Sequence, residues 1–374
     1  MAIRKRVAPG RIPFTWRKLV IAGAIAACAP AMPAFALDAQ PSQPESIGWS
    51  VQSRGTGVDA GRVQLTIESR WGEGNHSIWS DDRPISELQG LAAAQLTGPS
   101  APVHFVLARD AGRVDCSGMA GNFSGRGNCS FIVDPAFASY LRQRGMGSPT
   151  PHQAFTLTMS GVGRGLIDSM AEIGYARPTV EQLADMGIHG VTADFVRGLA
   201  RSGYRLASAG DLVNFKIHGV DLDYIRGMAA IGPKLQHLSA EDLVDLRIHG
   251  VTPDYVRQIA AMGPQFQNLT AGDLVNFRIH GAEPELVRAY AAFVRGSLKP
   301  DDVVDMAIHG VSADYLQDLA RLGYRDLSAD DVVNLRIHGV TPDYVRRLQQ
   351  SGMAHIPADQ LVRLRLAGFE PNGH

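Results

Sequence analysis

The tripeptide Ile-His-Gly occurs six times in the second half of this 374-residue chain, and successive copies are 29, 31, 31, 29 and 29 residues apart. A fixed period of this length is typical of repeat proteins, whose units are too small to bury an apolar face alone and must stack on their neighbours. The pattern therefore predicts a stacked scaffold. Its histidines are His189, His218, His249, His280, His309 and His338.

Each repeat has the pattern of two short helices. In five of the six repeats the first helix begins with Ser or Thr and carries Asp or Gln three residues later, as Ser239 and Asp242 do in the third repeat; Lys299 breaks the pattern in the fifth. This is the spacing of a capping box, and the glycine after the histidine is expected to end the helix. The second helix begins with a capping residue such as Thr252, followed by Pro253. We expect an α-helical hairpin repeat domain over residues 164–374, with about six units and a degenerate C-terminal cap.

The histidines allow two interpretations. An array of imidazoles could bind metal ions or sense protons. However, equivalent positions on stacked helices lie about 8 to 10 Å apart, too far to share one ion. We favour a structural role at the helix end, where a histidine meets terminal carbonyls and the negative end of the dipole. The residue four positions earlier alternates strictly between Asp and Asn, for which we have no explanation: Asp185, Asn214, Asp245, Asn276, Asp305 and Asn334.

Two further slots recur in the second helices. An aromatic slot is expected to pack between neighbouring repeats, with a ligand-binding stripe as the alternative. An arginine slot follows, and its residues are expected to pair with acids on adjacent units or to line a groove for an acidic partner. The aromatic slot holds Phe195, Tyr224, Tyr255, Tyr315 and Tyr344; the arginine slot holds Arg197, Arg226, Arg257, Arg288 and Arg346.

The region before the repeats has the composition of β-strands. Val63–Ile67, Val103–Leu107 and Phe155–Met159 combine β-branched or aromatic residues with approximate alternation. After a linker at residues 37–45, we expect a β-rich domain over residues 46–163, built as a small antiparallel sandwich or half-barrel. The predicted fold class is thus α+β, with this domain followed by the solenoid-like helical domain.

Two cysteines lie symmetrically about Asn122-Phe123, in a stretch expected to form a β-hairpin with a longer loop. Cys116 and Cys129 would face each other across its strands, so we predict a disulfide between them. A reduced pair is the alternative. A metal site is disfavoured, because a second pair of ligands is missing nearby.

The first 36 residues resemble a secretory signal peptide: basic residues, an apolar run over 19–29, and Ala34-Phe35-Ala36. We expect cleavage between Ala36 and Leu37 and a periplasmic or secreted product. Cys28 offers a lipoprotein-type alternative, in which cleavage before it leaves a lipid anchor; an uncleaved membrane anchor is a third possibility. After leader removal, no integral membrane span is expected.

Composition and motifs exclude several function classes. Without its leader the chain has 30 basic and 37 acidic residues, which disfavours nucleic acid as a partner. The helix-turn-helix pattern of each repeat is only weakly similar to DNA-gripping helical hairpins. The sequence contains no zinc-protease, nucleophile-elbow, P-loop or dinucleotide-binding motif in a suitable setting. We therefore expect no catalytic residues, no metal site and no cofactor.

Units such as residues 327–346 (LSADDVVNLRIHGVTPDYVR) resemble the extracytoplasmic tail repeats of some bacterial antirepressor membrane metallopeptidases of the β-lactam-sensor type. The resemblance covers about residues 179–369, and Phe105–Gly112 is similar to segments found beside such repeats. The peptidase domain is absent, so the resemblance implies the repeat module alone.

These observations predict an exported, non-enzymatic scaffold whose repeats bind a protein or peptide in the cell envelope. Two alternatives remain: a small-ligand sensor acting through the β domain, and an envelope hydrolase. The sequence leaves the partner's identity and the oligomeric state open.

Overall fold

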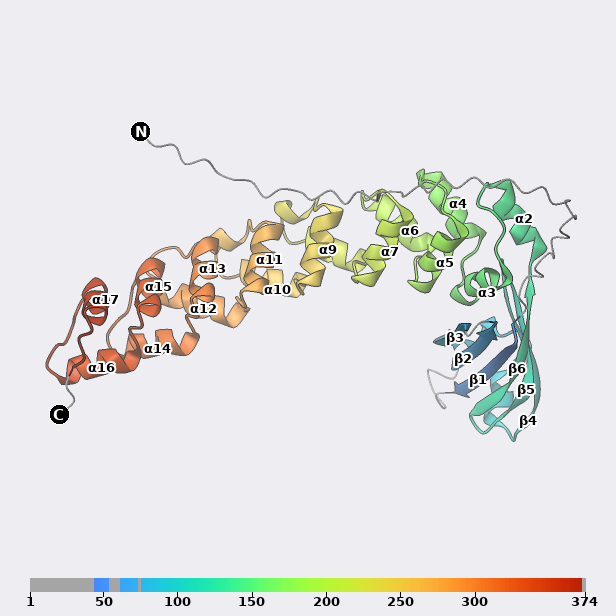
Figure 1. Cartoon of the computed structure of the whole chain (residues 1–374), viewed down its shortest axis with the longest axis horizontal. Coiled ribbons are helices and arrows are strands. Elements are labelled where there is room, and N and C mark those ends of the chain that lie inside the picture. Colours follow the sequence, from blue (N-terminus) through green and yellow to red (C-terminus); the bar gives the residue numbers. More distant parts are fainter. Residues whose placement is uncertain (1–43, 54–60, 73–74, 372–374) are drawn as a thin grey trace, which may run out of the picture. The chain divides into compact units, whose positions relative to one another are not determined.

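The computed structural model describes residues 44–53, 61–72 and 75–371, which belong to one compact unit (Figure 1). The predicted cleavage site at Ala36 and Leu37 and the alternative lipidation site at Cys28 lie outside these residues. Among the described residues, no helix is both long enough and apolar enough to cross a membrane.

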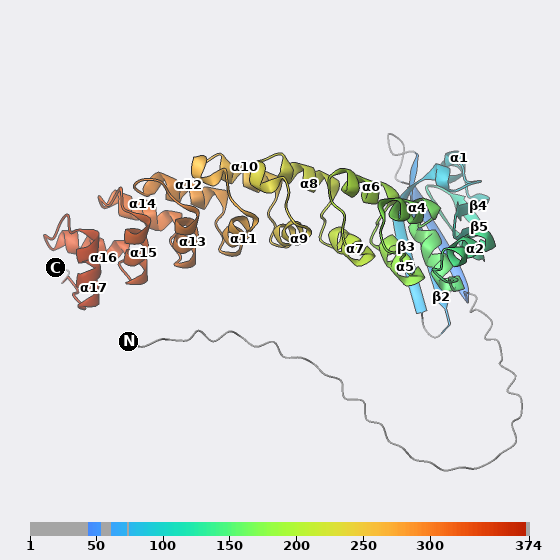
Figure 2. The same ribbon diagram turned by 90° about the horizontal axis from the view of Figure 1, so that it is seen from above.

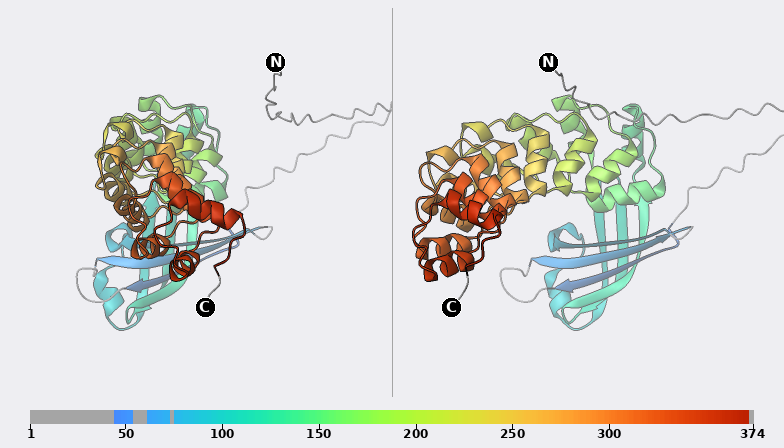
Figure 3. Two further views of the ribbon diagram at one scale, coloured as in Figure 1. Left: turned by 90° about the vertical axis from the view of Figure 1, so that its left-hand side faces the viewer. Right: turned by 60° about the vertical axis from the view of Figure 1, so that its left-hand side comes forward.

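The N-terminal part forms one open antiparallel sheet of six strands in the order β3-β2-β1-β6-β5-β4. The described residues thus contain a single twisted sheet (Figure 3), not the two packed sheets of a sandwich. A 3-10 turn η1 (Ile85–Glu87) and helix α1 (Ala93–Thr97) connect its two halves. The strands are β1 (Ser46–Ser53), β2 (Arg62–Trp71), β3 (Asn75–Pro84), β4 (Ala101–Arg109), β5 (Gly112–Gly121) and β6 (Ser124–Val133).

The β5–β6 hairpin places Cys116 directly opposite Cys129, and the expected disulfide joins them. The loop is shorter than predicted, because Asn122 and Phe123 alone connect the strands, both with positive φ. Their amides donate to the carbonyls of Gly98 and Leu96 near the end of α1. Contact with α1 therefore stabilises a backbone conformation that a phenylalanine rarely adopts.

The chain then forms helices of eight to ten residues. From α3 onward they alternate between two rows (Figure 2): the first-helix row contains the odd-numbered helices α3 to α17, and the second-helix row contains the even-numbered helices α4 to α16. The helices are α2 (Pro135–Gln143), α3 (Pro151–Ser160), α4 (Arg164–Ile173), α5 (Val180–Ile188), α6 (Ala193–Arg201), α7 (Ala209–Ile217), α8 (Leu222–Ala229), α9 (Ala240–Ile248), α10 (Pro253–Ala260), α11 (Ala271–Ile279), α12 (Pro284–Phe293), α13 (Pro300–Ile308), α14 (Ala313–Arg321), α15 (Ala329–Ile337), α16 (Pro342–Gln350) and α17 (Ala358–Leu366). The 3-10 turns η2 (Pro233–Leu235) and η3 (Pro264–Phe266) account for the two longer repeats.

The turn between the two helices of a repeat is built alike in every unit. In the third repeat, Ser239 and Asp242 form the capping box of α9, and His249 is its C-terminal cap. Gly250 follows with a φ of 69°, a conformation that a side chain would strain. The amide of Val251 then bonds to the Leu246 carbonyl, which closes the helix and turns the chain into α10.

The prediction of a strand at Phe155–Met159 is wrong, because these residues form the second half of α3. Thr150 and Gln153 make a capping box, and the hydroxyl of Thr158 donates to the Ala154 carbonyl at 2.8 Å. The alternation of threonines with apolar residues resembled a strand pattern, but in the helix the threonine hydroxyl bonds to a backbone carbonyl one turn earlier.

Helices α3 and α4 are in fact an additional, degenerate repeat. Thr150 precedes the equivalent Thr179 of α5 by 29 residues, and Gly161-Val162 precedes Gly190-Val191 by the same interval. Consistently, α3 packs on α5 and α4 packs on α6. The stack of repeats therefore begins directly against the β-sheet, on which α3 also packs.

Candidate functional site

The isoleucines of the Ile-His-Gly tripeptides are exposed to solvent. Each is the last residue of a first-row helix, and each keeps between 52% and 56% of its residue surface accessible. In α17 the same position is Leu366, which is 66% accessible. We call these residues the isoleucine row: Ile188, Ile217, Ile248, Ile279, Ile308, Ile337 and Leu366. Single exposed apolar residues are common on protein surfaces, but seven at one position of consecutive helices form a pattern.

The isoleucine row belongs to a wider face. In α9, Glu241, Asp245 and Ile248 follow the capping serine by two, six and nine residues, so they lie on one side of the helix and all are exposed. The valine slot borders them; it is half-buried as Val213 in α7 and buried as Val244 in α9. This outer face is neither part of the core nor covered by the second-helix row.

The equivalent face of α3 is covered. Met159 occupies the position of Ile188, yet only 2% of it is accessible, because it packs in the core of the β-sheet. Phe155 on the same side lies 5.3 Å from Phe131 and 5.5 Å from Trp71, measured between ring centroids. Thus the sheet itself covers, in the additional degenerate repeat of α3 and α4, the face that the six regular repeats leave open.

The histidines make local contacts. In His249, His309 and His338, Nδ1 lies 2.8 Å from the carbonyl oxygen four residues earlier, so the imidazole caps its own helix. The carbonyl of Asp245, not its carboxylate, is the partner of His249. Among the described residues, no group of three or more His, Cys, Asp and Glu side chains could hold a metal ion.

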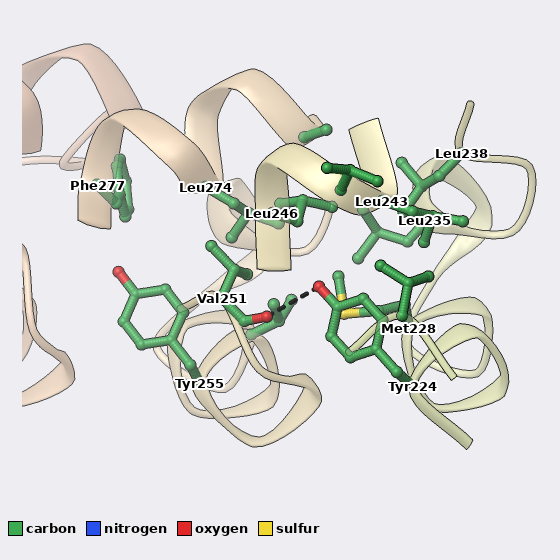
Figure 4. Packing of buried hydrophobic residues seen from close by; sticks show 14 of the residues in the cluster. Tyr224, Met228, Leu235, Leu238, Leu243, Leu246, Val251, Tyr255, Leu274 and Phe277 are labelled. Atoms are coloured by element: carbon green, nitrogen blue, oxygen red, sulfur yellow. Dashed lines mark hydrogen bonds between the residues drawn. The ribbon is translucent and has the colours of Figure 1, made fainter. Parts of the chain in front are cut away.

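Tyrosines of the aromatic slot link successive repeats. Tyr224 is buried, and its hydroxyl donates to the carbonyl of Val251 in the next repeat at 2.9 Å (Figure 4). Tyr255 donates in the same way to Ala282 at 2.7 Å, and Tyr315 to Val340 at 2.8 Å. Burial raises the pKa of the Tyr224 and Tyr315 hydroxyls to about 12. These contacts leave the rings inside the stack, so the slot is a joint between repeats and offers no stripe for a ligand.

A basic residue before the isoleucine completes this joint, and sequence reasoning missed it. The Arg247 guanidinium lies 4.8 Å from the centre of the Tyr224 ring, and its Nε donates to the Gly219 carbonyl at 3.0 Å. Arg336 repeats both contacts three units later, with the Tyr315 ring and the Gly310 carbonyl. One unit later, Arg278 lies over the Tyr255 ring, and its Nε donates to the His249 carbonyl at 3.3 Å. The tetrapeptide Arg-Ile-His-Gly, present in three of the six copies, was the available clue.

The arginine slot of the second helices behaves differently from the prediction. Arg226 pairs with Asp223, Arg257 with Asp254 and Arg346 with Asp343, in each case three residues earlier on the same helix. These are exposed pairs within one helix, not bridges between units, because the i, i+3 spacing brings the partners together before a neighbour can. The outer side of the second-helix row is therefore internally neutralised at these positions.

A hollow of about 650 Å³ lies between α7 and α9. Its wall includes Asn214 and Asp211 from α7, and Glu241, Val244 and Asp245 from α9. It thus opens beside the acidic part of the outer face of the third repeat. Arg205, His237 and Tyr204 line other parts of it.

Neither the comparison with protein-family models nor the search of curated proteins gives a match for this chain. The resemblance to the metallopeptidase tail repeats therefore stays a prediction based on the residues quoted for it.

Proposed function

We propose that this protein is an exported, non-enzymatic scaffold, and that its repeats bind a protein or peptide of the cell envelope through the isoleucine row. The observation that carries the proposal is the covered face of α3. There the sheet packs on Met159 and Phe155, whereas Ile188 and its six equivalents have no such cover among the described residues. Because this face packs against an apolar surface in α3, the same face of the other repeats is suited to pack against an apolar surface of a partner.

The size of the surface bears on the kind of partner. Burying the accessible half of an isoleucine contributes on the order of 1 kcal/mol. Micromolar affinity corresponds to about 8 kcal/mol, after the cost of association has been met. A single repeat is thus insufficient, and the partner has to contact several consecutive repeats, as repeat proteins commonly require.

Two observations support a location outside the cytoplasm. Cys116 and Cys129 form a disulfide, which persists in oxidising compartments. The first 36 residues have the composition of a signal peptide. Together they favour a periplasmic or secreted protein over one that functions beside reducing thiol systems.

Site-specific photocrosslinking tests the proposal. A photoreactive phenylalanine analogue at position 248 of the full chain, expressed in cells, should give discrete protein adducts upon irradiation. The same analogue at position 257, exposed on the second-helix row, is the matched control and should give none. The triple variant Ile217→Ser/Ile279→Ser/Ile308→Ser should abolish the adducts from position 248. Equal labelling at both positions, or labelling that survives the triple variant, would contradict the proposal.

The alternative of a small-ligand sensor has one observation in its favour. A hollow of about 910 Å³ lies over β1, β5 and β6, lined in part by Ser50, Gln52, Arg126 and Asn128. If this hollow binds a small ligand that the protein senses, Arg126→Ala should abolish binding of that ligand, and the isoleucine triple variant should leave its binding unchanged. The opposite result supports the scaffold.

A further inference from the structure

The outer face carries a charge pattern that the proposed function does not by itself explain. At the second and sixth positions after the cap, repeats one, three and five each bear two acids. Repeats two and four bear Gly and Asn at the same positions, and repeat six bears Asp330 and Asn334. The acid pairs are Glu181 with Asp185, Glu241 with Asp245, and Asp301 with Asp305. Through the fifth repeat, the Asp/Asn alternation is therefore one half of a two-position alternation with a period of two repeats, from which Asp330 in the sixth repeat departs.

Helix stability explains only part of this pattern. Glu181 and Glu241 lie in the first turn, where the helix dipole favours an acid. Asp185, Asp245 and Asp305 lie four residues before the C-terminal cap, where the dipole disfavours one, and Asn fills the slot elsewhere. All six carboxylates are exposed, and within the described part of the chain none has a basic partner in an ion pair.

From these observations we propose that the isoleucine row takes a basic peptide segment that is also apolar at regular intervals. The inference rests on the proposed function and names the chemistry of the partner. Apolar side chains of the segment would cover the isoleucines of every repeat, while its Lys or Arg side chains meet the acid pairs of alternate repeats. At the third repeat, a basic side chain can reach Glu241, Asp245 and Asp211 at the hollow between α7 and α9.

Two other features agree with a cationic partner. The chain without its leader has an excess of acidic residues, which attracts a basic segment over distances up to the Debye length. The pattern also ends with the stack: in α17 the sixth position is Arg363, which pairs with Asp359 at 3.3 Å. The neutralised last helix is suited to a terminal cap, not to a further acidic layer.

Fluorescence anisotropy with the mature full chain and two synthetic peptides tests the inference. Packed helices are about 8 to 10 Å apart, and a polyproline II chain rises about 3.1 Å per residue with three residues per turn, so one layer corresponds to roughly three peptide residues and every third side chain points to the same side. The basic probe, about 18 residues long, therefore has Leu at every third position and Arg between alternate leucines. The acidic probe has Glu in place of each Arg. We expect the chain to bind the basic probe, with affinity that falls as salt rises, and to bind the acidic probe at least tenfold more weakly.

A triple variant locates the charge effect. Asp185→Asn/Asp245→Asn/Asp305→Asn gives these repeats the residue that Asn214, Asn276 and Asn334 already provide, so folding should be preserved. It should weaken binding of the basic probe about tenfold. The control, Asp194→Asn/Asp223→Asn/Asp254→Asn, makes the same change in net charge on the second-helix row and should change binding less than twofold.

Several outcomes would overturn the inference. They are failure of the basic probe to bind, equal affinity for both probes, equal effects of the two triple variants, and sedimentation showing that a second copy of this chain occupies the row. These results leave the crosslinking test of the proposed function standing, since isoleucine-dependent adducts can form with a neutral or acidic partner. Conversely, if the isoleucine triple variant binds the basic probe as tightly as the unchanged chain does, charge alone attracts the probe and the inference fails.

Discussion

The two rows of helices differ most in what they expose. On the outer side of the second-helix row, acids such as Asp223 and Asp254 are paired with an arginine three residues later. On the outer face of the first-helix row, Asp245 has no such partner among the described residues, and Ile248 beside it is half exposed. These acids of the second-helix row are therefore neutralised by arginines on their own helix, whereas the acid and the isoleucine of the first-helix row remain accessible to a partner.

Because both rows are made of short capped helices with the same kind of buried side, stability alone does not require this difference. A solvated helix gains from i, i+3 or i, i+4 ion pairs, and the second-helix row uses them. Within the described residues, helices α5, α7, α9, α11, α13 and α15 of the first-helix row have no such pair, and each exposes a β-branched apolar residue to water. The comparison therefore separates the residues that build the stack from those available for binding.

The largest expected effect contrasts two neighbours in α9. Leu246 is fully buried, so Leu246→Ala should lower the free energy of unfolding by about 2 to 5 kcal/mol. Ile248→Ala, two residues away, should change it by about 0.5 kcal/mol or less, because Ile248 is 53% accessible. Denaturant unfolding of both variants measures the difference. A loss at Ile248 comparable with that at Leu246 would mean that the isoleucine row is part of the core.

A smaller effect is expected at the joints between repeats. Tyr255→Phe removes the hydrogen bond to the Ala282 carbonyl, and should cost about 1 kcal/mol or somewhat more, since the carbonyl stays buried. The ring itself fits the slot, because the first repeat carries Phe195 there. Thermal unfolding measures the loss, and Arg257→Ala on the same helix, a surface position, serves as the control. An unchanged Tm would show that the hydroxyl does not hold neighbouring repeats together.

The same tyrosines predict a loss of stability at alkaline pH. Burial raises the pKa of Tyr224 and Tyr315 to about 12 in the folded chain, whereas an exposed tyrosine in the unfolded chain titrates near 10. Between these values the unfolded state releases protons that the folded state retains, so stability is complete below pH 10 and falls as the pH rises toward 12. Unfolding followed from pH 8 to 11.5 should show this decline, and Tyr224→Phe/Tyr315→Phe should reduce its slope. An equal slope in the variant would contradict the assignment.

The smallest expected changes in the free energy of unfolding come from removing one acid in each row, and they should differ in sign. Asp254→Asn breaks an exposed pair with Arg257 and should destabilise the chain by about 0.5 kcal/mol or less. Asp245→Asn removes an unpaired acid from the end of a helix, and should be neutral or stabilising by a few tenths of a kcal/mol. Chemical denaturation with replicate curves can resolve the difference in unfolding free energy between the two variants. Destabilisation by Asp245→Asn would indicate a structural role for that acid and weaken the case for binding.

Much of the architecture could be predicted from local chemistry. Capping boxes, the glycine after each histidine and the proline in several second helices determine where helices begin and end, and these are interactions within a few residues. The disulfide was predictable as well, because the symmetry of Cys116 and Cys129 about the hairpin fixes their register. The helical structure of the Phe155–Met159 segment was not predictable. Alternation of apolar residues and threonine is compatible with a strand, and also with a helix whose threonine hydroxyls donate to its own backbone carbonyls.

The length and caps of the six regular repeats follow from the sequence, because those depend on contacts between residues close along the chain; the additional repeat of α3 and α4 was recognised only in the fold. Which apolar residues are buried depends on how the helices pack: Leu246 and Ile248 are similarly hydrophobic, and their difference in exposure arises from which side of α9 the neighbouring helices cover. The tertiary structure likewise decided that Met159 is covered by the sheet while Ile188, in the same slot, is not. Burial depends on where distant segments pack, and no local pattern carries that information.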